Sequence, residues 1–230
     1  MKATYSNLII TLTIALLCMH PAGACPSDEI KMPAVDPPEL SIASGLAFTH
    51  TAQYNGEFSA AVDSAKQFCA KYKRQHPDVK SLAIVSDIDE TIVDNREEYA
   101  AHPDKFVWSE FEAWLKQARA PALKKTAAFL KWARKEGFAI MLVTGRPEPD
   151  RIYTIENLVH DGIAYDALYM RPNGADVDSI PAQVFKTGAR KSIADMGFTV
   201  VVNIGDQFSD LVGGHSIDCE KLPNKMYFIK

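Results

Sequence analysis

Residues 85–95, with the sequence VSDIDETIVDN, are the stretch on which the expected fold depends. They continue an apolar run, 82–85, that is typical of a short buried strand. Asp87 and Asp89 follow where the chain should leave the sheet, and residues two apart in an extended chain lie on the same side. Both carboxylates can therefore face one point, where a bound cation or a shared proton relieves their repulsion. The alternative is an acidic loop in which Asp94 or Asn95 caps the next helix.

The rest of the chain alternates between strand-like and helix-like patterns. Apolar runs typical of buried strands recur at 138–143, 167–170 and 198–204. Apolar residues at three- and four-residue spacing predict helices within 58–72, 123–134, 152–159 and 186–196. Such alternation predicts an α/β fold, a parallel sheet with helices on both faces. A last apolar piece, 226–229, is a candidate edge strand.

Three of the predicted strands end in short polar motifs. The first carries Asp87 and Asp89, the second ends at 144–146 (Thr-Gly-Arg), and the fourth ends at Gly205-Asp206, with Asp210 following. The carboxyl ends of parallel strands meet at one edge, so these motifs should converge on one crevice. Four carboxylates there form an oxygen-rich site that suits Mg²⁺ better than zinc.

A cation beside hydrogen-bond donors and a carboxylate is what phosphoryl transfer through an aspartyl-phosphate requires. Lys186 and the Thr144 hydroxyl are the candidate donors, together with nearby backbone amides. Arg190 and Lys191 lie one helical turn beyond Lys186 and compete with it for this role. Arg146 has two open interpretations, a substrate ligand or a partner in an ion pair.

A segment between the first two motifs, about 96–121, is a candidate small lid. It is rich in charged residues and concentrates five aromatic ones: Tyr99, Phe106, Trp108, Phe111 and Trp114. The stripe formed by Phe111, Trp114 and Leu115 has helical spacing. It either packs against the body of the protein or presents aromatic rings to the substrate.

The amino terminus has the pattern of an export signal. Lys2 precedes an apolar stretch, 8–18, that is too short to span a bilayer comfortably, and small residues follow at 22–24. We therefore expect a signal peptide over 1–24, an extended Pro-rich arm over 25–40 and a single domain over 41–230. Cys25 leaves two outcomes open, cleavage alone or lipidation of the new amino terminus.

The amino-acid composition limits the classes of molecule that we expect the protein to bind. The chain has 230 residues, 47% of them hydrophobic, and a formal charge of −4, so it lacks the net positive charge typical of proteins that bind nucleic acid polymers, and we expect no such partner. After cleavage Cys25, Cys69 and Cys219 remain, and their spacing leaves the disulfide pairing open. Cys69 lies on an apolar helix face, where a buried small hydrophobe is expected.

The motifs together resemble the haloacid dehalogenase (HAD) superfamily of phosphohydrolases, and within it the secreted acid phosphatase branch. That branch includes bacterial class B- and C-like acid phosphatases and plant vegetative storage proteins. Residues 87–91 are similar to the family's first motif, 144–146 to its second, Lys186 to its third and 205–210 to its fourth. The ending 222–227 also resembles this branch. The resemblance covers about 82–230, and four motifs in the right order make it specific.

The resemblance implies a HAD-like Rossmannoid fold with a small helical cap, and it implies a role for each motif. Asp87 would be the nucleophile and Asp89 the general acid and base. Phosphate would be bound by Thr144, Gly145 and Lys186. Mg²⁺ would be held by Asp87, by Asp89 through its backbone carbonyl and by Asp206, with Asp210 in a second shell or acting through water.

The expected function is that of an exported Mg²⁺-dependent acid phosphatase that hydrolyses small phosphomonoesters. Its location would be periplasmic, secreted or, with a lipid on Cys25, the outer membrane. The alternatives are a narrower 5′-nucleotidase or sugar phosphatase, and a non-catalytic surface or storage protein of the same fold. Some storage relatives lack the nucleophile, whereas Asp87, Asp89, Lys186 and Asp206 are all present here. Their joint presence argues against the non-catalytic alternative.

Overall fold

A parallel five-stranded sheet forms the centre of the protein in a computed structural model that describes residues 31–33, 40–172 and 180–229. The strand order is β3-β2-β1-β4-β5, and every neighbouring pair is parallel. The strands span Leu82–Ser86, Ala139–Pro147, Ala167–Arg171, Thr199–Gly205 and Asp218–Lys221, numbered β1 to β5 in chain order. The α/β fold expected from the alternating pattern is confirmed.

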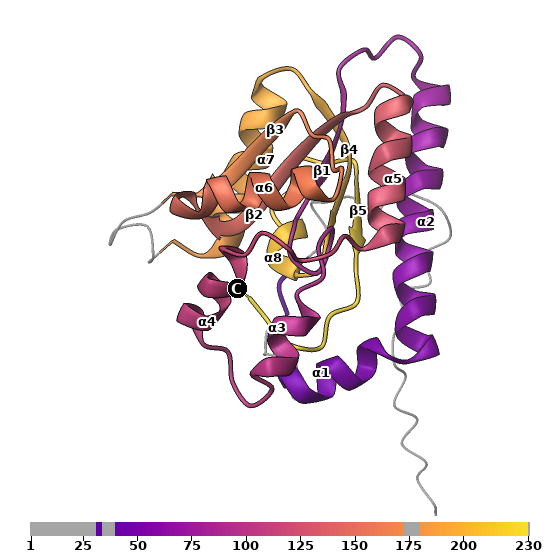
Figure 1. The fold of residues 1–230 in the computed structure, drawn as a ribbon. Helices are drawn as coiled ribbons and strands as arrows, with labels where there is room; N and C mark the ends of the chain where they lie inside the picture. The colour runs from indigo at the N-terminus through magenta and orange to yellow at the C-terminus, as the bar shows by residue number, and fades with distance from the viewer. Residues whose placement is uncertain (1–30, 34–39, 173–179, 230) are drawn as a thin grey trace, which may run out of the picture.

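Helices cover both faces of the sheet (Figure 1). The helices α2 (Ala52–Gln75) and α5 (Lys124–Lys135) pack on one face, and α7 (Ala182–Asp195) packs on the other. The pleat of β1 explains this arrangement, because Ile84 points into the larger core and its neighbours Ala83 and Val85 point into the smaller one. The remaining helices are α1 (Ile42–Thr49), α3 (Arg96–Ala101), α4 (Trp108–Leu115), η1 (Glu148–Asp150), α6 (Arg151–His160) and α8 (Phe208–Leu211).

The order in which the chain adds strands to the sheet reverses at β1. The chain builds β1, β2 and β3 toward one edge, then places β4 and β5 on the other side of β1. Such a reversal opens the crevice where parallel α/β sheets bind ligands, at the carboxyl ends of the strands. In Figure 1 these ends point downward, toward α1, α3 and α4.

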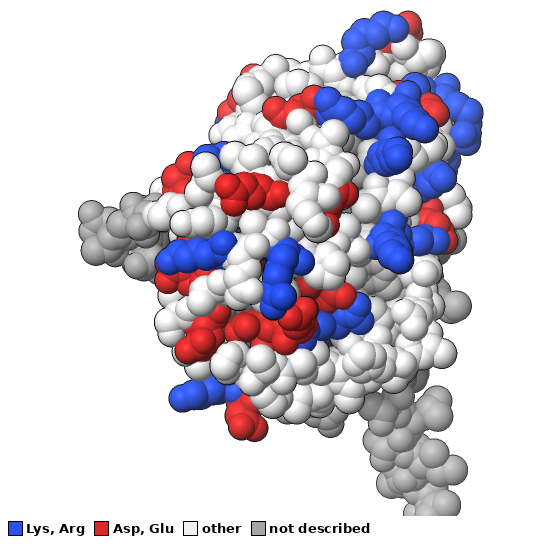
Figure 2. Space-filling model, viewed as in Figure 1, with Lys and Arg blue, Asp and Glu red and all other residues white. Residues whose placement is uncertain are grey.

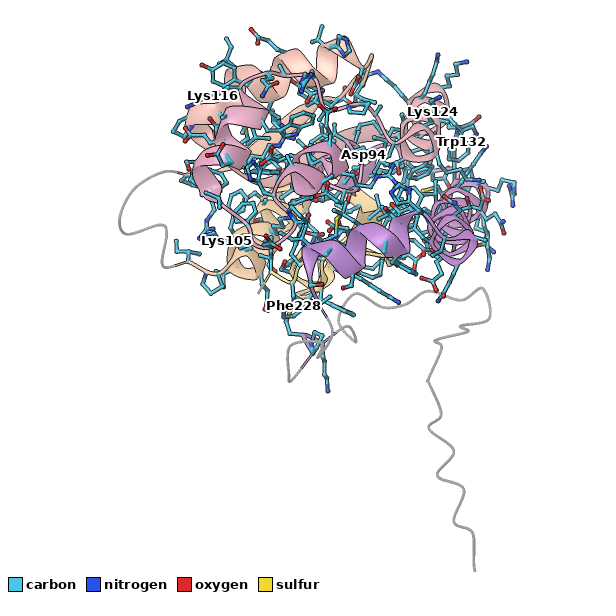
Figure 3. The ribbon with its side chains drawn as sticks, turned by 60° about the horizontal axis from the view of Figure 1, so that its bottom comes forward. Asp94, Lys105, Lys116, Lys124, Trp132 and Phe228 are labelled. Carbon is cyan, nitrogen blue, oxygen red and sulfur yellow. The ribbon has the colours of Figure 1, made fainter. Side chains whose placement is uncertain are left out.

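The inserted segment lies at this end of the molecule. Figure 3 looks onto it: Lys105 and Lys116 of the segment lie on one side of Asp94, and Lys124 and Trp132 of α5 lie on the other. Basic side chains gather elsewhere, over α2 and α5 in Figure 2. Among the described residues, none of the helices combines the length and the apolar character needed to cross a membrane.

Two expectations about local structure were wrong. The edge strand is β5 and not 226–229, which crosses the carboxyl end of the sheet without forming a strand. Three of the four residues of β5 are charged, so hydrophobic periodicity did not reveal it. The last predicted helix begins at Ala182 after Pro181, and Lys186 therefore lies inside it and does not lead it.

Several expectations fall on residues outside the described ranges: the signal peptide, Cys25 and most of the Pro-rich arm. The expected burial of Cys69 on a helix face agrees with the structure. Gly137 and Gly197 each end a helix with a positive φ, at 84° and 90°, and Cys69 is fully buried on α2.

Candidate active site

Three carboxylates meet at the switch point of the sheet. Asp87 follows β1, while Asp206 and Asp210 follow β4, and one oxygen of each lies within 4.8 Å of the others. All three side chains are buried. Gly205 makes the approach possible, because a Cβ at this position would stand 2.3 Å from Asp210 Oδ2.

Lys186 reaches this cluster from α7. Its Nζ donates to Asp87 Oδ1 at 2.8 Å and to Asp210 Oδ1. Burial lowers the pKa of Lys186, but the charges of Asp210 and Asp87 outweigh that effect and raise the pKa above its ordinary value. The ammonium is therefore a fixed positive charge beside the Asp87 carboxylate.

The surroundings of Asp87 raise the pKa of its carboxyl group. Burial raises its pKa, the Lys186 ammonium opposes that rise, and the neighbouring Asp210, Asp206 and Asp89 reinforce it. The pKa of Asp206 is raised as well, by burial first and then by Asp210. Both shifts arise first from burial, and the mutual repulsion of the carboxylates adds to them.

The net charge of the cluster fits a divalent cation. Three buried carboxylates (Asp87, Asp206 and Asp210) surround one buried ammonium, that of Lys186, which leaves two negative charges among these four side chains. Only oxygen ligands are present in the cluster, as a hard cation such as Mg²⁺ prefers. The residues therefore fit the expected metal.

Asp89 lies apart from this cluster, in a bidentate ion pair. Arg146 donates from Nη2 to Asp89 Oδ1 at 2.7 Å and from Nε to Oδ2 at 3.0 Å. Burial raises the pKa of Asp89, but the charge and the hydrogen bonds of Arg146, together with a bond from Asn95, hold the pKa below its ordinary value. At 18% the Asp89 side chain is more exposed than that of Asp87, at 6%, so it lies nearer the opening of the site.

The second motif lies beside these acids. Thr144 is fully buried near the end of β2, and its Oγ1 accepts a hydrogen bond of 3.1 Å from the Arg146 amide. Gly145 is exposed, and a Cβ there would contact nothing. Of the two interpretations of Arg146, the structure shows the ion pair, with Asp89 as the partner.

Further residues hold the carboxylates in place. Asp206 Oδ2 accepts from Gln207 Nε2 at 2.7 Å and from Asn224 Nδ2 at 2.6 Å. The backbone amide of Gln207 donates to Asp210 Oδ2 at 2.8 Å. Sequence reasoning gave these two amides no role, although both lie within stretches that carry the resemblance. Only the folded chain brings residue 224 to the end of β4.

A family model supports the same interpretation. Residues 35–230 match the model described as HAD superfamily, subfamily IIIB (acid phosphatase). The chain is 36% identical over 149 residues to acid phosphatase 1 of Solanum lycopersicum, a match that covers 63% of this chain and 58% of that protein. It is 31% identical over 199 residues to the stem 28 kDa glycoprotein of Glycine max, covering 84% of this chain and 76% of the relative.

Solved structures show the same fold. The class C acid phosphatase from Bacillus anthracis superposes with a TM-score of 0.63 at 20% sequence identity, covering 81% of this chain and 85% of that one. At this identity the likeness concerns the fold alone. The family match extends over most of the chain and includes every residue of the site described above. The chain therefore belongs to the acid phosphatase subfamily IIIB of the HAD superfamily.

Proposed function

We propose that the protein is an exported, Mg²⁺-dependent phosphomonoesterase that works through a phosphorylated Asp87. The observation that carries the proposal is the meeting of Asp87, Asp206, Asp210 and Lys186 at the switch point, with Asp89 at the more exposed side. Family membership supports the reaction class. The apolar, signal-like segment at 8–18 supports export.

In the first half of the reaction, an Asp87 carboxylate oxygen attacks the phosphorus atom of the substrate. The bond from phosphorus to the leaving oxygen breaks, and the protonated form of Asp89, which is the minor form near neutral pH because Arg146 holds the pKa low, gives its proton to that oxygen, so an alcohol departs. Lys186, beside Asp87, stabilises the negative charge on the phosphoryl oxygens. Thr144 and Gly145, at the end of β2, are the proposed partners for the same oxygens.

In the second half, the Asp89 carboxylate takes a proton from water while the water oxygen attacks phosphorus. The bond between Asp87 and phosphorus breaks, phosphate leaves and Asp89 is protonated again. A bound Mg²⁺ would neutralise charge between Asp87 and the phosphate dianion. Asp87, the Asp89 backbone carbonyl and Asp206 are the proposed ligands, with Asp210 bound directly or through water.

The test is hydrolysis of para-nitrophenyl phosphate by the purified protein, by its Asp87→Asn variant and by an Asp63→Asn control. Asp63 lies on α2, where it forms an exposed ion pair with Lys125, and neither residue belongs to the candidate site. We expect Asp87→Asn to reduce turnover by roughly 10³-fold or more without loss of folding, because the variant keeps the shape and loses the attacking charge. The control should match the wild type.

Metal removal tests the cofactor. EDTA should abolish activity and added Mg²⁺ should restore it, and Asp206→Ala should shift the Mg²⁺ requirement to higher concentration because it removes an anionic ligand. Full activity in EDTA, or zinc replacing magnesium without loss, would contradict a site for a hard cation. An Asp87→Asn variant within about tenfold of the wild type would contradict the covalent route.

A further inference from the structure

Asn95 follows the first motif and is fully buried. Its side-chain amide makes three hydrogen bonds to three different parts of the site. Nδ2 donates to Asp89 Oδ1 at 2.8 Å and to Glu90 Oε1 at 3.0 Å. Oδ1 accepts from Trp114 Nε1 of the inserted helix α4 at 2.9 Å. This amide is the link between the inserted segment and the candidate general acid.

The chemistry of the partners fixes which way the amide points. An indole N–H can only donate, so it must meet the amide oxygen. The pKa of Asp89 is held below its ordinary value, so its carboxylate can only accept and must meet the amide nitrogen. Rotating the Asn95 amide by half a turn would break the bonds to Trp114 and to Asp89 at once, and the orientation is therefore held from both sides.

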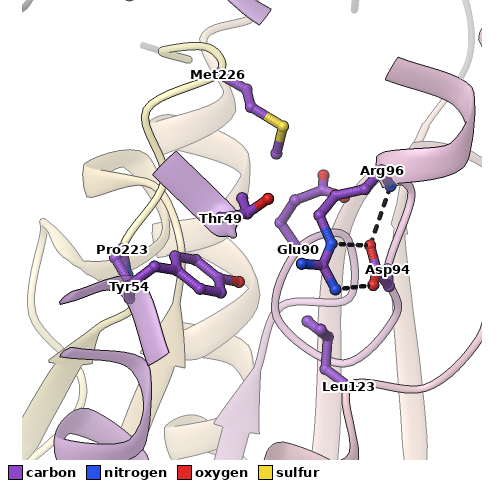
Figure 4. Close-up of a pocket in the computed structure, with 8 residues that line it drawn as sticks. All are labelled: Thr49, Tyr54, Glu90, Asp94, Arg96, Leu123, Pro223 and Met226. Carbon is purple, nitrogen blue, oxygen red and sulfur yellow. Dashed lines mark hydrogen bonds and ion pairs between the residues drawn. The ribbon is translucent and has the colours of Figure 1, made fainter. Parts of the chain in front are cut away.

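Glu90 gives the amide a rigid support. Glu90 is buried with a left-handed backbone, φ 53°, and its carboxylate also accepts from the Asn95 backbone amide at 3.0 Å. The hydroxyls of Tyr99 and Tyr227 donate to its other oxygen. Glu90 lines a small pocket together with Thr49 and Met226 (Figure 4), and the pocket volume of about 10 Å³ admits roughly one water molecule. Four hydrogen bonds, two of them from Asn95, hold the Glu90 carboxyl in place.

The two carboxylate oxygens of Asp89 accept different numbers of hydrogen bonds, and the bond from Asn95 adds to this difference. Oδ1 accepts from Asn95 Nδ2 and from both Nη2 and Nε of Arg146. Oδ2 accepts only from Arg146 Nε among the described side chains. The carboxyl plane is thus held with Oδ2 as the oxygen that keeps capacity for a proton.

We propose that Asn95 is a positioning residue for Asp89, and that Trp114 holds Asn95 in turn. Asn95 keeps Asp89 Oδ2 in the orientation from which a proton passes to the leaving oxygen. The inserted helix therefore acts on acid catalysis, although Trp114 itself is buried and does not reach the acid. This inference rests on the proposed phosphatase function.

The test compares two substrates that differ in their need for a proton. Para-nitrophenolate leaves readily without protonation, whereas the alkoxide of glycerol phosphate does not. Asn95→Ala should lower kcat for glycerol phosphate about tenfold or more beyond any loss for para-nitrophenyl phosphate, because it misaligns the acid. Trp114→Phe removes the indole N–H together with part of the ring system, and it should change the ratio in the same direction by roughly threefold.

The matched control is Trp132→Phe on α5, whose ring stacks with Phe129 away from the site. Its substrate ratio should equal that of the wild type. Introducing Asn95→Ala into an Asp89→Asn background supplies a second readout. The acid is already absent there, so the substrate ratio should not change further.

A purely structural role for Asn95 predicts a different result. Both substrates would then lose activity equally, in the wild-type and Asp89→Asn backgrounds alike, together with a lower melting temperature. That outcome overturns the inference and leaves the phosphatase function standing. If Asn95→Ala does not fold, an unchanged ratio in Trp114→Phe is sufficient to overturn it. Failure of the wild type to hydrolyse either substrate would instead remove the proposed function.

Discussion

At the scale of single residues, three basic side chains of α7 have different contacts and therefore different roles. Lys186 points into the carboxylate cluster. Arg190, one turn later, is fully buried and donates to backbone carbonyls of the loop after Asp210, including Gly214 at 3.0 Å. Lys191 is exposed and pairs with Asp195 on the same helix. Lys186 and Arg190 are four residues apart and share the buried face of the helix one turn apart, whereas the rotation of about 100° per residue carries Lys191 to the exposed side.

These different roles predict unequal effects of substitution. Lys186→Met should lower kcat/KM for phosphomonoesters by about 10²-fold or more, because it removes a positive charge from the place where phosphoryl charge develops. It should also lower the melting temperature of the metal-free protein, since Asp87 and Asp210 lose their shared ammonium. Steady-state kinetics and a thermal melt measure both effects.

Lys191→Met is the matched control, because the side chain is on the same helix and exposed. Its kinetics and melting temperature should stay near the wild-type values, as for most surface ion pairs. Equal kinetics for Lys186→Met and Lys191→Met would remove Lys186 from the phosphate site.

At the scale of elements, the inserted segment is divided between core and surface. Phe111 and Trp114 are buried and Leu115 packs with them, as expected for a packing stripe. Phe106 and Trp108 remain 50% and 46% exposed, with their ring centroids 6.3 Å apart. The stripe of Phe111, Trp114 and Leu115 therefore packs against the body of the protein, and only the rings of Phe106 and Trp108, outside the stripe, remain exposed among the five aromatic residues of the segment.

Substrate selectivity should depend on the exposed rings alone. Trp108→Leu should raise KM for aryl and nucleoside phosphates, relative to glycerol phosphate, by the equivalent of about 1 to 3 kcal/mol of lost stacking. Phe111→Leu should instead lower the melting temperature and affect all substrates alike, because it leaves a gap in the core. An unselective Trp108→Leu variant would exclude this ring from the substrate.

At the scale of the whole molecule, buried acids make stability depend on pH. Burial raises the pKa of Glu220, on the edge strand β5, to about 7. The folded chain then binds a proton at Glu220 that the unfolded chain, with an ordinary pKa of 4.5, releases. The contribution of Glu220 to the free energy of unfolding is therefore fully present below about pH 4.5 and is lost as the pH rises through 7. Burial shifts Asp87 and Asp206 in the same direction.

We expect the melting temperature of the metal-free protein to fall between about pH 4.5 and 7. Glu220→Gln keeps the shape and removes the titrating proton, so it should flatten this slope, with roughly 2 to 4 °C recovered at pH 7 for each kcal/mol. Glu57→Gln, on the exposed surface of α2, should leave the slope unchanged. A Glu220→Gln variant with the wild-type slope would contradict the raised pKa of Glu220.

Local patterns were enough to predict the framework. Buried strands and amphipathic helices repeat at periods that are visible in the sequence, so β1 to β4 and the helices beside them were found. The elements that escaped lack such a pattern: α1, α3, η1 and α8 are short, and β5 is a charged edge strand. The shared edge of parallel strands also allowed the meeting of Asp87, Asp206 and Asp210 to be predicted without coordinates.

The parallel α/β framework and the acids at its strand ends were therefore predictable from the amino-acid sequence, because both follow from local periodicity and from the direction of the strands. The side chains that hold those acids became known from the folded chain. Arg146 lies 57 residues from Asp89, Trp114 lies 19 from Asn95 and Tyr227 lies 137 from Glu90. Contacts at such separations arise from the packing of whole elements, and no local pattern encodes them.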